Sequence, residues 1–124
     1  MNSLGINFYF TIMDVYDYID QMKEMHELLI FYVDNEENDE ENFQNFIDHV
    51  TSHRISENKG ELKVLMHLIV NLSNNHHYNQ IFLNKIEQIL IFLQKDIKLK
   101  FTNFEIFDIC KKNKRILHFL FKNQ

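Results

Sequence analysis

Residues 11–33, TIMDVYDYIDQMKEMHELLIFYV, decide the fold class of this chain. Apolar side chains recur in this stretch every three or four residues, which is the spacing that places them on one face of an α-helix. The stretch predicts one amphipathic helix of about six turns. The positions that keep the spacing are Ile12, Val15, Tyr16, Ile19, Met22, His26, Leu29, Ile30 and Val33.

Helical spacing continues along the rest of the chain. The acidic run DNEENDEE, residues 34–41, predicts a solvated loop, and its last residues can begin the next helix because the positive N-terminal end of a helix favours carboxylates. Apolar stripes then predict helices around 43–50, over 62–72 with Ser56 as N-cap, and over 82–97.

Two short helices are predicted at the C-terminal end. Thr102 and Glu105 have the spacing of a capping box ahead of an apolar segment, and Asn113 is placed to cap KRILHFLF. No two-residue alternation accompanies hairpin turn signals, so we expect little or no sheet. The sequence therefore predicts a single all-α domain of five to six helices in antiparallel helical hairpins, acidic over 1–55 and hairpin-like over 56–124.

The composition argues against an enzyme. The chain has no Pro, no Trp, two Gly and one Cys, so glycine-rich loops for phosphates or dinucleotides and an internal disulfide are not expected. Cys110 ends an apolar segment and is predicted to be a core thiol rather than a nucleophile. We expect no catalytic residue and no cofactor.

The segment MNSLGINFYF lacks the positive charge of a secretion signal, and no apolar run approaches the roughly 18 residues of a spanning helix. The prediction is an intracellular, cytoplasmic protein without a membrane partner.

The histidines are the first candidates for chemistry. His49 and His53 lie four residues apart and can share a helix face, while His76 and His77 are adjacent in NLSNNHHYNQ, residues 71–80. The sequence contains no H-E-x-x-H motif, which would have supported a metal site. The favoured interpretation is solvent-facing or capping histidines, with NNHH as a connection between two helices.

Charge is distributed unevenly along the chain. Residues 1–50 hold twelve acidic residues and only Lys23 as a base, whereas residues 51–124 hold twelve bases and six acids. Such polarity can close within the molecule or drive head-to-tail association. The cluster KKNKR, residues 111–115, is able to bind phosphate, but a basic turn between helices is usually solvated. Phe104, Phe107 and Phe119 nearby keep the spacing of core residues.

The first helix has a second set of apolar residues beside its main stripe. A helix that is apolar on two sides needs two partners, and in a chain this short one partner can be another molecule. The candidate partner-binding residues are Met13, Tyr18, Met25, Leu28, Phe31, Tyr32, Lys111, Lys112, Lys114 and Arg115.

The segments ELKVLMHLIVNLSNNHHYNQIFLNKIEQIL and IKLKFTNFEIFDICKKNKRILHFL suggest a family. They resemble the N-terminal helical domain of unknown function that precedes the repeats in protist ankyrin-repeat proteins. The resemblance covers about residues 57–122 and, more weakly, 12–33. Here the chain ends at Gln124, where ankyrin repeats would be expected.

The resemblance implies a helical interaction or assembly module and gives no catalytic residues. The last two helices are too short to bury an apolar face alone, so ankyrin-like or solenoid-like stacking is expected toward the C-terminus. The sequence thus predicts a non-catalytic protein-interaction or self-assembly module, with a protein or a second copy as partner rather than nucleic acid. The alternative is a small metal- or nucleic-acid-binding regulatory protein.

Overall fold

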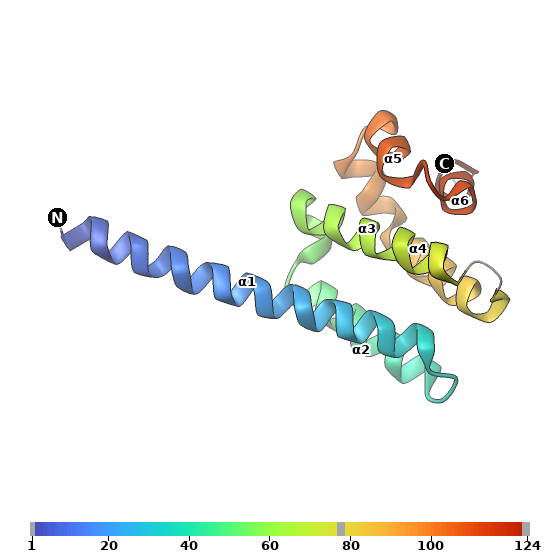
Figure 1. Ribbon diagram of the computed structural model, residues 1–124, viewed down its shortest axis with the longest axis horizontal. Helices are drawn as coiled ribbons and strands as arrows, with labels where there is room; N and C mark the ends of the chain where they lie inside the picture. Colours follow the sequence, from blue (N-terminus) through green and yellow to red (C-terminus); the bar gives the residue numbers. More distant parts are fainter. Residues whose placement is uncertain (1, 77–78, 123–124) are drawn as a thin grey trace.

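The computed structural model of the protein describes residues 2–76 and 79–122, with side chains from residue 15 onward. Every regular element in these residues is helical, which confirms the predicted all-α class (Figure 1). The elements are α1 (Asn2–Asp34), α2 (Asp39–Ser52), a short 3₁₀ helix η1 (Ile55–Glu57), α3 (Lys59–Asn75), α4 (Gln80–Lys100), α5 (Asn103–Cys110) and α6 (Lys114–Lys122).

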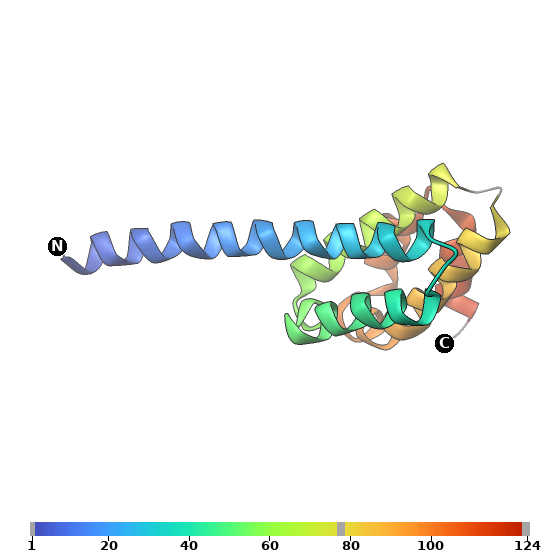
Figure 2. The same ribbon diagram turned by 90° about the horizontal axis from the view of Figure 1, so that it is seen from below.

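Helix α1 is longer than predicted, because it begins at Asn2 and runs for 33 residues. Figure 2 shows its C-terminal part alongside α2 and its N-terminal part extending away from all other helices. Gln21 lies at the boundary, with Nε2 3.5 Å from the carbonyl oxygen of His53 and 3.4 Å from Oε2 of Glu61. We call residues 2–20 the overhang and residues 21–34 the packed half.

The turn from α1 to α2 is made without glycine. Asn38 adopts a left-handed conformation with φ 59°, which asparagine tolerates better than most residues. Helix α2 then starts with three acidic residues in its first turn, Asp39, Glu40 and Glu41. This confirms that the acidic run ends by beginning a helix, where the helix dipole favours negative charge.

Asparagine also caps three later helices. Asn58 Oδ1 accepts a hydrogen bond of 3.0 Å from the amide of Glu61, so the predicted cap at Ser56 is wrong. Ser56 lies inside η1, which occupies the residues just before α3. At the start of α4, Asn79 accepts from the amide of Phe82 at 3.1 Å.

The two predicted caps at the C-terminal end are confirmed. Thr102 and Glu105 form a reciprocal capping box, with hydrogen bonds of 3.1 and 3.2 Å between each side chain and the other residue's amide. Asn113 accepts from the amide of Ile116 at 3.0 Å and so caps α6.

The core lies between the packed half of α1 and helices α2, α3 and α4, and extends toward α5 and α6. Burial of these apolar side chains supplies the main stabilising free energy of such a fold. The fully buried side chains include Met25, Leu29, Phe46, Leu62, Leu65, Ile69, Ile89 and Leu93.

A buried lysine of α4 holds the end of α1. Lys85 Nζ donates hydrogen bonds to the carbonyl oxygens of Tyr32, at 3.1 Å, and Asn35, and lies 2.8 Å from Oδ1 of Asp39. Helix α1 has no basic residue in its own last turn. Lys85 therefore supplies from α4 the positive charge that favours the C-terminal end of α1.

Candidate partner-binding surfaces

The apolar stripe of α1 runs from the packed half into the overhang. Tyr18, Met25 and Tyr32 are seven residues apart and so lie along one line on the helix. Met25 is 0% exposed and Tyr32 is 5% exposed, but Tyr18 is 40% exposed. A parallel line changes in the same way, from buried Leu29 to Val15, which is 50% exposed. The stripe continues where the rest of the domain no longer covers it.

This arrangement corrects the predicted second apolar face. Met25 and Tyr32 belong to the core, so their assignment to a partner-binding face is wrong. Leu28 is partly buried against the same core, and Phe31 is 54% exposed. Met13 lies in the part of α1 whose side chains are outside the described residues.

The overhang combines apolar and acidic residues. Val15, Tyr16, Tyr18 and Ile19 are all exposed. The acidic residues of this segment are Asp14, Asp17 and Asp20, and the sequence has no Lys or Arg before Lys23. In the part of the overhang whose side chains are described, residues 15–20, apolar and acidic residues are therefore exposed together.

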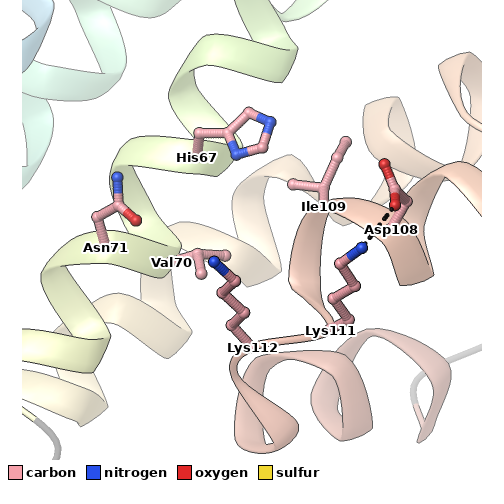
Figure 3. Close-up of a pocket in the computed structure, with 7 residues that line it drawn as sticks. All are labelled: His67, Val70, Asn71, Asp108, Ile109, Lys111 and Lys112. Carbon is pink, nitrogen blue, oxygen red and sulfur yellow. Dashed lines mark hydrogen bonds and ion pairs between the residues drawn. The ribbon is translucent and has the colours of Figure 1, made fainter.

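A groove lies between α3 and α5, and Figure 3 shows the residues that line its main pocket. This pocket has a volume of about 260 Å³. Buried Val70 and Ile109 contribute the apolar part of its wall. The polar lining residues are His67 and Asn71 from α3, Asp108 from α5, and Lys111 and Lys112 from the connection to α6.

A second hollow shares Asp108 and Ile109 with this pocket and extends it along α5. Its other lining residues are Lys63, Phe104 and Glu105. We call the two hollows together the α3–α5 groove. Phe104 is 76% exposed and Phe107 is also exposed, which contradicts the prediction that these aromatics are core residues. Phe119 is partly buried against the core.

The acidic residues of the groove are paired with lysines. Lys111 Nζ lies 3.1 Å from Oδ1 of Asp108. Glu105 is held by Lys59 at 2.8 Å, and this hydrogen bond, together with that from the Thr102 amide, lowers the pKa of Glu105 to about 2. Glu105 therefore stays ionised and is neutralised locally. Lys63 and Lys112 are left as the exposed positive charges of the groove.

The predicted basic cluster 111–115 does not form one patch. The Arg115 guanidinium donates to Oε1 of Glu87 on α4, at 3.2 Å from Nε and 2.9 Å from Nη2. Lys111 and Lys112 lie at the α3–α5 groove, and Lys114 is exposed at the start of α6. Of the four candidate cations in this cluster, only Lys111 and Lys112 line the groove.

The prediction of solvent-facing or capping histidines is wrong for His49, whereas His53 is exposed and His76 is the C-cap of α3. His49 is buried, with Nε2 3.0 Å from the carbonyl oxygen of Gln21, and its ring centroid lies 4.4 Å from that of His53. The ring of His76 stacks on Phe82 at 4.2 Å as the chain leaves α3. His77 is outside the described residues. Among the residues described, no group of three or more His, Cys, Asp or Glu side chains is placed to hold a metal ion.

Cys110 is buried, as predicted. Burial raises the pKa of its thiol to about 11, because desolvation disfavours the thiolate. A thiol in this state is a poor nucleophile.

Comparison with known proteins gives no match: no family model, no curated protein and no solved structure is significantly similar to the chain. The resemblance to the N-terminal domain of ankyrin-repeat proteins therefore stays a prediction. None of the helices in the described residues combines the length and the apolar character needed to cross a membrane.

The sequence did not predict the α3–α5 groove. Its lining residues come from segments about 40 positions apart, and their meeting depends on how α5 packs on α3. The one available signal was the capping box at Thr102, which fixes where α5 begins.

Proposed function

We propose that this chain is a non-catalytic protein-interaction module that assembles through the α1 overhang. The observation that carries the proposal is the change along one line of α1, from buried Met25 to exposed Tyr18. Apolar residues with this spacing pack into the core in the packed half, whereas Val15 and Tyr18 of the overhang are exposed.

Exposed apolar stripes on helices favour association. Covering a valine- or leucine-sized side chain contributes about 1.5 kcal/mol or more, and a heptad-like spacing lets a second helix or a groove cover several at once. Val15 and Tyr18 are placed for such a contact. Asp17 and Asp20 add negative charge, which steers the overhang toward a basic surface.

The alternative of a metal- or nucleic-acid-binding regulator has less support. Arg115 and Lys111 of the basic cluster face Glu87 and Asp108, so their charge is already partly compensated. Among the histidines, His49 contacts the Gln21 carbonyl oxygen and His76 stacks on Phe82 within the domain. Self-assembly is the form of the proposal that can be tested with the chain alone.

The test is the molar mass in solution, measured by light scattering over a range of protein concentrations. We expect wild-type protein to associate as the concentration rises, and the double variant Val15→Ser, Tyr18→Ser to stay near the chain mass of 15.2 kDa. The matched control is Glu24→Ser, Glu27→Ser, which changes two exposed residues of the packed half. A wild-type protein that is monomeric at every concentration contradicts self-assembly.

A further inference from the structure

We propose that the α3–α5 groove binds the α1 overhang of a second copy of this chain, so that copies associate head to tail. This inference rests on the proposed function and adds to it the surface that the overhang contacts. Three observations support it: the charges of the two surfaces, their apolar residues, and the direction of α1.

The two surfaces carry opposite charge. The overhang has Asp14, Asp17 and Asp20 and no basic residue. In the groove, the carboxylates of Asp108 and Glu105 are already paired with Lys111 and Lys59. Positive charge therefore remains at Lys63 and Lys112, which line one hollow of the groove each. Opposite potentials of this kind favour encounter and fix orientation.

The apolar parts of the two surfaces are also complementary. Exposed Phe104 borders the groove, and Val70 and Ile109 line its main pocket. The pocket, at about 260 Å³, is smaller than the usual site for a drug-sized ligand and suits a single side chain. The overhang offers Tyr18 with Val15 as side chains of this kind. An amphipathic helix lying in a groove is a common mode of protein recognition.

The groove cannot be filled by the overhang of its own chain. Helix α1 is continuous from Asn2 to Asp34, and its overhang points away from the helices that form the groove (Figure 1, Figure 2). The occupant is therefore a second copy. Pairing of two overhangs with each other would instead bring two acidic segments together without a counter-charge, which is unfavourable.

A head-to-tail contact has a definite consequence for assembly. After one such contact, one copy still has a free groove and the other a free overhang, so the contact continues into open chains unless the geometry closes a ring. Association should weaken as salt is added, because the attracting charges are exposed.

The first test reverses the charge of each surface. In the groove variant Lys63, Lys111 and Lys112 are replaced by Glu, and in the overhang variant Asp14, Asp17 and Asp20 are replaced by Lys. Each variant alone should associate at least about tenfold more weakly than wild type. An equal mixture of the two variants should associate again, because each overhang then meets a groove of opposite charge. The matched control replaces three exposed lysines elsewhere, Lys95, Lys114 and Lys122, by Glu.

The outcomes separate this inference from the proposed function. If the groove variant assembles as tightly as wild type and control, the overhang binds elsewhere, and the inference fails while the proposed function stands. If wild-type protein does not assemble, both fail. Circular dichroism of each variant establishes that its helical content is unchanged.

A second test does not depend on charge reversal. Tyr18→Cys protein is mixed with Asn71→Cys protein under mild oxidation, with Cys110 replaced by Ser in both. Head-to-tail docking predicts a disulfide-linked dimer in the mixture and little in either variant alone. The opposite result is a disulfide-linked homodimer of the Tyr18→Cys variant and no heterodimer in the mixture. It would mean that two overhangs pair with each other, and it would overturn the inference.

Discussion

The overhang and the packed half of α1 belong to one helix and have the same apolar spacing, but only one of them is covered. Met25, Leu29 and Tyr32 pack against the rest of the domain, whereas Val15 and Tyr18, seven or fourteen residues earlier, are exposed. The difference arises because α2 ends close to Gln21, which contacts His53 and Glu61, and the overhang extends beyond it away from the other helices (Figure 2). A periodic stripe thus predicts an amphipathic helix, but it does not show how much of the stripe the rest of the chain covers.

The largest expected difference between the two halves is in core packing. Leu29→Ala leaves a cavity under a fully buried side chain and should lower the free energy of unfolding by about 3 kcal/mol. Val15→Ala, fourteen residues earlier, should change it by less than about 0.5 kcal/mol in dilute monomer. Urea unfolding followed by circular dichroism measures both values. Equal losses would mean that the overhang is packed in the monomer.

The next largest expected effect is on the stability that Lys85 contributes at the C-terminal end of α1. Lys85→Met removes the hydrogen bonds to the carbonyl oxygens of Tyr32 and Asn35, and should lower the free energy of unfolding by about 2 kcal/mol. The control is Lys95→Met on the exposed side of α4, for which we expect little change. A Lys85→Met protein as stable as this control would show that the lysine does not hold the end of α1.

The smallest effect tests whether the two halves unfold together. Glycine costs about 1 kcal/mol more than alanine inside a helix, so Glu27→Gly should be less stable than Glu27→Ala by about this amount. The same comparison at Asp17 should leave the unfolding of the domain unchanged, because the overhang can fray while the core stays intact. Thermal unfolding of the four variants gives both differences. A loss at Asp17 equal to that at Glu27 would mean that α1 unfolds as a single unit.

Much of the helical architecture could be predicted from local patterns. The stripe of α1, the acidic start of α2 and the caps at Thr102 and Asn113 all depend on residues within a few positions of one another. Ser56 is not the cap because the sequence does not show the 3₁₀ turn that makes Asn58 the N-cap of α3.

The candidate binding surfaces are harder to predict because they depend on contacts between distant segments. The pairing of Lys85 with the end of α1 and the meeting of His67 with Asp108 at the groove leave no local pattern. Phe104 has core-like spacing but remains exposed, since α5 is only eight residues long and packs one face on the domain. Exposure is a property of the assembled helices, and the sequence of one helix does not determine it.

The length of the overhang has a hydrodynamic consequence. At a rise of 1.5 Å per residue, residues 2–20 form a rod of about 28 Å beside a small domain. Such a shape increases frictional drag, so a single chain of 15.2 kDa should leave a gel-filtration column earlier than a sphere of the same mass. Breaking the helix within the rod should shift the elution toward that of a compact monomer without any change in molar mass.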